Sequence, residues 1–422
     1  MNKRLNLFFL GSLTSVLVFI AGCQEQRQNW THLRGSNLDG IAVVCHVPLK
    51  WNQDSNIVWK TEIHDRGWSS PVVFGNQVWM TTARGDGKEL FAVCVDFNTG
   101  KILHDLKIFE PDSVFGKHSI NTYATPTPCI EKGFVYVHFG RYGTACINTD
   151  NGLIVWQRYD LVCDHVQGPG ASPVLYNNLL ILHYEGQDTQ YIVALDKSDG
   201  STVWKTFRPE EPYQPLAPIG RKSYITPLMI NVSGKDLLVS NGSAICIAYN
   251  PETGKEIWRV TRGAESTIAM PVSEGGIVFF YTGYMTAADG HNFSELLAVN
   301  ADGNGDITET NIIWRKETPV LQLLTPVIKD GLIYTIDSEN NLMCMDAKTG
   351  ENYYSERMKG KYNASPVYAD GNIYFCSTRG EIMVIKEGTE LEIVAQNRLE
   401  GEIWATPAIL RNNILIRTSD YL

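Results

Sequence analysis

The sequence predicts an all-β fold, an eight-bladed β-propeller of four-stranded antiparallel blades, from three observations. A Ser/Thr-Pro step followed by apolar residues recurs at intervals of 40–55 residues, which is the length of one propeller blade. A glycine turn and a bulky ring recur at fixed places within the intervals. Outside the first 22 residues, no apolar pattern of useful length has the 3.6-residue period of a helix.

Length and composition restrict the class of protein. The 422 residues exceed one ordinary hydrophobic core, which is consistent with a large repetitive fold. A hydrophobic fraction of 44% and a charged fraction of 19% exclude a largely disordered chain. The net charge is −10, and no stripe of Lys and Arg is present. Because nucleic-acid binders need such a basic surface, the sequence predicts no nucleic-acid partner.

The first residues predict export. A basic start, Met1–Arg4, precedes an apolar run over 5–20 and the small residues Ala21 and Gly22, as in a secretory signal peptide. The ending Ala21-Gly22-Cys23 resembles the lipobox of bacterial lipoproteins. This resemblance implies cleavage after residue 22 and a lipid on Cys23, and Gln24 implies sorting to the outer membrane. The alternative is an ordinary signal peptide followed by a chance cysteine.

The propeller is expected over 51–422, after a signal peptide over 1–22 and a lipidated tether and lead-in over 23–50. Proline is tolerated at the first residue of a strand, because no ladder hydrogen bond is lost there. One anchor proline therefore opens each blade, and Met270 replaces the hydroxyl residue once. The eight anchors are Ser70-Pro71, Thr125-Pro126, Ser172-Pro173, Thr226-Pro227, Met270-Pro271, Thr325-Pro326, Ser365-Pro366 and Thr406-Pro407.

Within each unit, a third apolar run ends in Asp or Asn, and a tight turn leads to an aromatic residue. The turn glycine supplies the positive φ that a hairpin of this kind requires. A ring at one fixed place per blade packs neighbouring sheets against each other. The turn glycines are Gly100, Gly152, Gly200, Gly254 and Gly350, and the rings four residues later are His104, Trp156, Trp204, Trp258 and Tyr354.

The two ends of the chain predict how the ring closes. The eighth unit has a strand after Pro407 and a second over 413–418, but no glycine turn or aromatic of its own. Residues 56–61, which include Trp59, precede the first anchor and have the pattern of a fourth strand. We therefore expect Trp59 to complete the last blade, which would leave no open sheet edge.

The segment Ala194–Trp204 is similar to the Ala-x-Asp-x-x-Thr-Gly-x-x-x-Trp signature of pyrroloquinoline-quinone-like (PQQ-like) β-propeller repeats. The resemblance covers residues 51–422. Two kinds of family member follow from it. The quinoprotein alcohol dehydrogenases bind the quinone and Ca²⁺ in the central channel. The propeller lipoprotein of the outer-membrane barrel-assembly machine has the same fold and no cofactor.

The sequence predicts no catalytic residues, no metal site and no cofactor. The adjacent cysteines of the quinoprotein enzymes are absent, and their calcium ligands and base cannot be placed on this chain. Residues 300–307 resemble the start of a calcium loop, but they stand where other blades have their hairpin, which favours a turn. Cysteines that exchange with alanine at one repeat position are expected to be buried and free. The pairing of Cys45 and Cys163 stays open.

The mouth of the central channel is the candidate ligand site. Loops that precede the anchor prolines converge at one end of a propeller axis. The candidates three and five residues before the prolines are Arg66, Trp68, Asn121, Tyr123, Lys222, Tyr224, Lys361, Asn363, Glu402 and Trp404. Rings and charges of this kind suit a peptide, a glycan or a small anion. Alternatively, the rings are core residues and the cations are solvated at the rim.

These observations predict a non-catalytic envelope lipoprotein. Its propeller would be a binding platform for an envelope protein or an extracellular polymer, with the membrane contacted through the lipid anchor. Two alternatives stay open. One is a PQQ- and calcium-dependent oxidoreductase, and the other is a glycan-binding or glycan-active propeller that uses the aromatic mouth.

Overall fold

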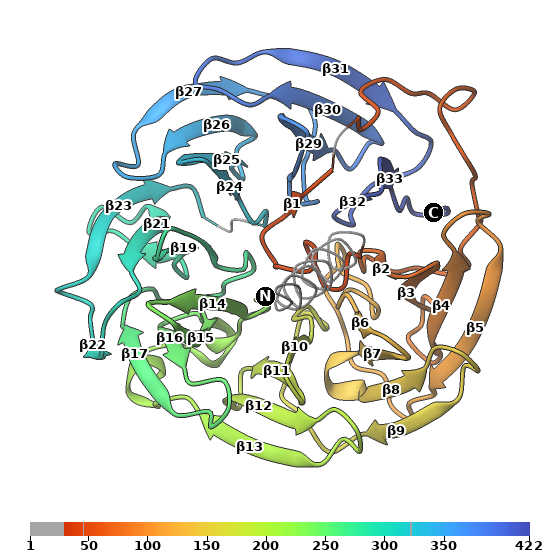
Figure 1. The fold of residues 1–422 in the computed structure, drawn as a ribbon. Helices are drawn as coiled ribbons and strands as arrows, with labels where there is room; N and C mark the ends of the chain where they lie inside the picture. Colours follow the sequence, from red (N-terminus) through yellow and green to blue (C-terminus); the bar gives the residue numbers. More distant parts are fainter. Residues whose placement is uncertain (1–28, 45, 321–322) are drawn as a thin grey trace, which may run out of the picture.

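A computed structural model describes residues 29–44, 46–320 and 323–422 (Figure 1). Strands of these residues form eight sheets, which stand side by side in a ring around a central axis. Within the described ranges the helices are short 3-10 turns, η1 (Gly140–Tyr142), η2 (Glu211–Tyr213) and η3 (Pro218–Arg221), and none could span a membrane. The predicted all-β propeller is confirmed. The predicted signal peptide, Cys23 and Cys45 lie outside the described residues.

The first four blades are regular antiparallel sheets. Blade 1 contains β2 (Val72–Phe74), β3 (Gln77–Ala83), β4 (Leu90–Asp96) and β5 (Ile102–Phe109). Blade 2 contains β6 (Cys129–Glu131), β7 (Phe134–His138), β8 (Thr144–Asn148) and β9 (Ile154–Arg158). Blade 3 contains β10 (Val174–Tyr176), β11 (Leu179–Glu185), β12 (Gln190–Asp196) and β13 (Thr202–Phe207). Blade 4 contains β14 (Leu228–Val232), β15 (Lys235–Ser240), β16 (Cys246–Tyr249) and β17 (Glu256–Val260), with β22 (Gly305–Asp306) added in parallel.

The last four blades vary more. Blade 5 contains β18 (Val272–Glu274), β19 (Ile277–Tyr281), β20 (Met285–Thr286), β21 (Asn292–Asn300) and β23 (Ile312–Thr318). Blade 6 contains β24 (Val327–Lys329), β25 (Leu332–Ile336), β26 (Asn341–Asp346) and β27 (Asn352–Arg357). Blade 7 contains β28 (Val367–Ala369), β29 (Asn372–Cys376), β30 (Glu381–Lys386) and β31 (Ile393–Arg398), with β1 (Ile41–Ala42) parallel to β28. Blade 8 contains β32 (Ala408–Leu410) and β33 (Asn413–Leu415).

The aromatic residue of the fourth strand docks on the hairpin of the next blade. The indole Nε1 of Trp204 donates a hydrogen bond of 3.0 Å to the carbonyl oxygen of Pro251. A Cβ atom on Gly254, where φ is +67°, would lie 2.4 Å from the same indole. The turn glycine therefore serves the ring contact as well as the backbone conformation. Trp156 and Trp314 repeat this docking on the carbonyl oxygens of Lys197 and Ala347.

The anchor residues link the blades near the axis. The amide of Ser70 donates to the hydroxyl of Thr127 at 2.9 Å, and the amide of Thr127 donates to the hydroxyl of Ser172 at 2.9 Å. The anchor of the second blade is therefore Thr127-Pro128, directly before β6, and the predicted Thr125-Pro126 was two residues out of register. The same link recurs at the hydroxyls of Thr226, Thr325, Ser365 and Thr406.

The two ends of the described chain meet in blade 8. The amide of Thr61 donates to the carbonyl of Leu422, the amide of Leu422 donates back to the carbonyl of Thr61, and both bonds are 2.8 Å long. The N-terminal part thus adds the outer strand of the last blade, as the sequence predicted. Trp59 itself docks on blade 1, where its indole donates to the carbonyl of Phe97 at 2.9 Å.

Residues 29–42, here called the central segment, lie across the axis of the ring (Figure 1). Trp30 pairs with Val73 of β2, and β1 pairs with β28 on the other side of the ring. The fully buried Arg34 donates to the carbonyl oxygens of Thr325, Pro326 and Pro366. A segment expected to be a lead-in therefore covers one end of the channel.

Glycine at the docking position should matter more than glycine in an open hairpin. We expect Gly254→Ala to lower the free energy of unfolding by roughly 1–3 kcal/mol more than Gly234→Ala, because the added methyl group meets the Trp204 ring. Gly234 also has a positive φ, but nothing lies within 4 Å of its Cβ position. Urea denaturation of both variants measures the difference, and equal losses would contradict the docking contact.

The central segment should make stability depend on pH. The His32 Nε2 accepts a hydrogen bond from the Leu175 amide at 3.2 Å, and burial lowers the pKa of His32 to about 4. Between that value and the ordinary pKa of about 6.5, the unfolded chain binds a proton that the folded chain does not. This stability is thus present above pH 6.5 and is lost as the pH falls toward 4. We expect the urea midpoint of His32→Gln to fall less than that of the unchanged protein between pH 7 and pH 5. Parallel pH profiles would contradict this account.

Candidate functional site

Two tryptophans stack at the mouth of the channel. The rings of Trp68 and Trp404 are 5.2 Å apart at an angle of 14°, and both side chains are half-buried. They come from the loops before the first strands of blades 1 and 8, which ring closure makes neighbours. The Trp68 indole donates to the carbonyl of Ile120 at 3.0 Å, and the Trp404 indole donates to the carboxylate of Glu402 at 3.0 Å. Both rings are therefore held in place.

Charged groups surround the stacked rings. The exposed Arg66 places its guanidinium carbon 5.9 Å from the centre of the Trp68 ring. Burial and then the charge of Arg66 lower the pKa of Lys117, so the two cations lie within electrostatic reach of each other. We call Arg66, Trp68, Glu402 and Trp404 the tryptophan patch. The predicted candidate list missed Lys117, because it stands in the long connection between β5 and β6 rather than beside an anchor.

Four other predicted mouth residues have structural contacts. Asn121 donates through its side chain to the carbonyl oxygens of Gln167 and Pro169, which fastens the loops of blades 2 and 3 together. The buried Tyr123 donates its hydroxyl to the carbonyl of Phe115 at 3.0 Å. The register correction in blade 2 explains these two positions, since they precede the true anchor by seven and five residues.

Blades 4 and 7 supply the remaining candidates. Lys222 is 4% exposed, its ammonium donates to the Ser266 hydroxyl at 2.8 Å, and burial lowers its pKa. Tyr224 is 8% exposed, and its ring lies 5.7 Å from that of His165. Lys361 is exposed and Asn363 is half-buried. The geometry thus groups the four residues of the tryptophan patch, while Lys222 and Tyr224 belong to the packed interior.

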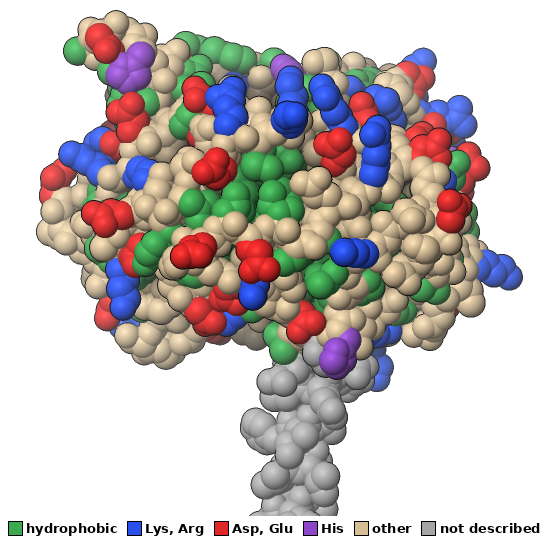
Figure 2. Space-filling view, turned by 90° about the horizontal axis from the view of Figure 1, so that it is seen from above, with side chains coloured by type: hydrophobic (Ala, Val, Ile, Leu, Met, Phe, Trp, Pro, Cys, Tyr) green, Lys and Arg blue, Asp and Glu red, His purple; other side chains and the backbone are tan. Residues whose placement is uncertain are grey.

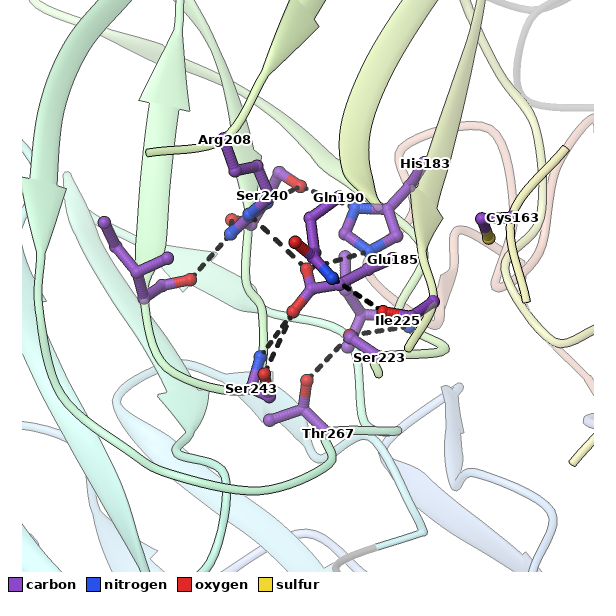
Figure 3. Close-up of polar contacts among 12 residues, drawn as sticks. Cys163, His183, Glu185, Gln190, Arg208, Ser223, Ile225, Ser240, Ser243 and Thr267 are labelled. Atoms are coloured by element: carbon purple, nitrogen blue, oxygen red, sulfur yellow. Dashed lines mark hydrogen bonds and ion pairs between the residues drawn. The ribbon is translucent and has the colours of Figure 1, made fainter. Parts of the chain in front are cut away.

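A buried polar cluster joins blades 3 and 4 (Figure 3). Glu185 stands at the end of β11 and is fully buried. Its carboxylate accepts hydrogen bonds from the Ser243 amide at 2.8 Å and the Tyr213 hydroxyl at 3.0 Å. The Arg208 Nε lies 3.4 Å from the other carboxylate oxygen, on the opposite side of the cluster from Ser243. Burial raises the pKa of Glu185, and the Arg208 charge opposes that shift.

His183 completes this cluster. Its Nδ1 is 2.9 Å from the Ser240 hydroxyl, and its Nε2 is 3.4 Å from Glu185 (Figure 3). Arg208 donates to the same Ser240 oxygen at 3.0 Å. The histidine tautomer with its proton on Nε2 satisfies both contacts, because Ser240 can then donate to Nδ1. Burial lowers the pKa of His183 well below its usual value. The cluster is a neutral-histidine clamp between blades, and the repeat pattern carried no signal for it.

Cysteines and metal-type ligands form no centre in the parts of the chain that are described. Cys94, Cys146 and Cys344 are buried and free, as predicted from their repeat position. Cys163 is also free and lies 3.1 Å from the His165 Nε2, and burial raises the pKa of its thiol well above the usual value. No group of three or more His, Cys, Asp or Glu side chains is arranged to hold a metal ion within those ranges.

The outer surface carries both signs of charge. Figure 2 shows Lys and Arg side chains gathered toward the upper part of the face in view, with Asp and Glu among and below them and an apolar patch between. A mixed surface of this kind does not give the single-sign field that attracts nucleic acid. The prediction that no nucleic acid is a partner stays a prediction.

The clamp should be costly to break. We expect Glu185→Gln to lower the free energy of unfolding by roughly 3–5 kcal/mol, because Arg208 then stays buried without a counter-charge. The matched control is Glu317→Gln, which breaks the exposed pair of Glu317 with His291 and should cost at most about 1 kcal/mol. Thermal unfolding measures both. A double variant with Arg208→Gln should lose less than the sum of the single losses, and strict additivity would contradict the ion pair.

Known proteins place this chain among propellers. A family model described as outer membrane protein assembly factor BamB matches residues 49–206, 188–306 and 304–391. A tetrathionate hydrolase of Acidithiobacillus ferrooxidans is 26% identical over 144 residues. That match covers 30% of this chain and 28% of the hydrolase, so the chain spans little more than a quarter of the length of this curated relative.

Solved structures show the same architecture. BamB from Moraxella catarrhalis superposes with a TM-score of 0.58 and 10% identity over 86% of this chain and 97% of that chain. A europium-containing methanol dehydrogenase gives 0.66 and 11% over 93% and 89%. A computationally designed protein gives 0.55 and 12% over 86% and 98%. At these identities the likeness shows the fold alone.

The family match covers most of the chain and agrees with the PQQ-like repeat signature found in its blades. The chain belongs to the family described as outer membrane protein assembly factor BamB.

Proposed function

We propose that this protein is a lipid-anchored component of the bacterial cell envelope whose propeller binds protein partners through the tryptophan patch and does no catalysis. The observation that carries the proposal is the stacked pair of Trp68 and Trp404, half-exposed and held by hydrogen bonds beside Arg66. Tryptophan and arginine are the residues that most often supply the binding energy of protein interfaces. A pair that is already ordered loses little entropy on binding.

The placement of the N-terminal residues supports this role. Asn29 accepts a hydrogen bond from the Gly75 amide, at the turn between β2 and β3. That turn is at the opposite end of the axis from the loops that hold the tryptophan patch. Six residues separate Cys23 from Asn29 and span at most ~20 Å when extended. A lipid on Cys23 would therefore keep the covered end near the membrane and direct the patch away from it.

A protein partner fits the patch better than a sugar. The two indoles cover each other's facing surfaces, and their polar edges already donate to Ile120 and Glu402. Sugar recognition by stacking needs free ring faces and free polar groups beside them. The rim charges of Arg66 and Glu402 offer instead the paired donor and acceptor that a polypeptide surface can match.

Truncation of the stacked rings tests the proposal. We expect Trp68→Ala and Trp404→Ala each to reduce partner crosslinking at least about tenfold, since a central anchor of an interface contributes about 2 kcal/mol or more. A photo-reactive residue at position 402 in intact cells reports the crosslink, and mass spectrometry shows whether the product contains polypeptide. The control variant Tyr353→Ala removes an exposed ring on β27 of blade 6. Equal crosslinking in all variants, or a product without polypeptide, would contradict the proposal.

A further inference from the structure

Blade 8 has a shortened third strand. In blade 7, β30 extends over six residues between β29 and β31, and Glu381 pairs with Arg398. In blade 8, Tyr421 takes the place of Glu381, because it pairs with Glu62 in the same antiparallel manner. Leu422 then corresponds to the second residue of β30. The last four positions of that strand, 383–386 in blade 7, have no counterpart among the described residues of blade 8.

An apolar groove lies where these four positions would be. Its cavity volume is about 550 Å³. Strand β33 forms one wall and residues 57–60 form the other, with lining side chains that include Ile57, Val58, Lys60, Ile414, Ile416 and Leu422. Val58 is 75% exposed and Ile57 is 39% exposed. Large apolar side chains at such exposure have the environment of strands that lack a neighbour.

Both walls of the groove have backbone that a strand could pair with. In the described structure β33 pairs with β32 on one side, whereas the second strands of blades 6 and 7 pair on both sides. Residues 57–60 are extended toward Thr61, where pairing with Leu422 begins. Neighbouring strands in a sheet lie about 4.8 Å apart. A single strand inserted here would therefore contact β33 and residues 57–60 together.

We propose that this groove binds an extended segment of a partner polypeptide, which inserts as the missing part of the third strand of blade 8. The segment would run antiparallel to β33, in line with Tyr421 and Leu422. Strand addition at a sheet edge supplies main-chain hydrogen bonds, and the side-chain pockets select the sequence. This site is separate from the tryptophan patch and does not depend on it.

The third strands of the other blades indicate which sequence fits. β4, β12 and β26 each consist of buried apolar residues that end in Asp, with Cys94, Ala194 and Cys344 directly opposite the ring of the fourth strand. In blade 8 that ring is Trp59. The partner segment is therefore apolar, carries a small residue opposite Trp59, and ends in Asp or Asn. A large side chain at the small position would meet the indole.

A peptide with the sequence of residues 191–196, Tyr-Ile-Val-Ala-Leu-Asp, is a direct probe. We expect it to bind the full-length protein saturably in fluorescence anisotropy. A peptide with proline in place of its valine should bind at least tenfold more weakly, because proline cannot donate the backbone hydrogen bond. Hydrogen exchange of the amides at 413–416 should slow when the first peptide is bound. Equal binding of the proline peptide, or unchanged exchange at 413–416, would overturn the proposal.

Variants of the protein locate the site. Val58→Asp places a charge in the groove and should weaken peptide binding at least tenfold, while its high exposure leaves folding intact. The matched control Val203→Asp changes a residue on β13 that is 50% exposed and should bind as the unchanged protein does. Trp68→Ala should also bind the peptide normally, which separates this proposal from the tryptophan patch. Self-association that Val58→Asp abolishes would show that the groove takes a second copy of the chain, and would overturn the assignment to a partner.

Discussion

The ring depends on one contact, the docking of a fourth-strand aromatic on the hairpin of the next blade. Each blade is a small sheet with two apolar faces, so it is stable only between neighbours. The indole of Trp204 buries its ring against Gly254 and donates its N–H to the carbonyl of Pro251. The contact therefore satisfies a polar group and removes apolar surface in the same place. Trp59 makes it across the junction of the chain ends, which joins blade 8 to blade 1.

Inside the ring, polar groups are matched across blade boundaries rather than within blades. The anchor hydroxyls accept from the amides of the preceding blade, and Arg34 of the central segment donates to carbonyls of blades 6 and 7. The Glu185 clamp does the same between blades 3 and 4. Such links make the relative positions of the blades depend on specific hydrogen bonds. The consequence for function is a rigid mouth, on which the tryptophan patch is held.

Closure of the ring also creates the least regular part of the protein. Seven blades take their outer strands from consecutive residues, whereas blade 8 combines residues near both ends of the described chain. Two chain segments that meet in one sheet need not be of matching length, and the third strand there spans only part of its neighbours. The tryptophan patch at the mouth and the groove on the outer side both involve blade 8. The junction of the chain ends is thus where this propeller differs most from its own repeats.

The sequence by itself determined the architecture, because the repeat is local. The anchor prolines, the turn glycines and the rings four residues later each follow from backbone conformation within one blade. The pattern also predicted that the N-terminal residues close the last blade, and hence that Trp68 and Trp404 belong to neighbouring blades. Only the tertiary structure decided between the tandem steps Thr125-Pro126 and Thr127-Pro128, since a hydrogen bond from Ser70 makes the choice.

The tertiary structure alone also separated the mouth into exposed and buried residues. Lys222 and Trp404 precede their anchors in the same way, yet one is enclosed by Ser266 and the other stacks at the surface. The central segment and the Glu185 clamp had no repeat signature, and the sequence did not predict either. Their positions depend on which loops meet across blades, and contacts between residues far apart in the chain leave no periodic pattern in one sequence.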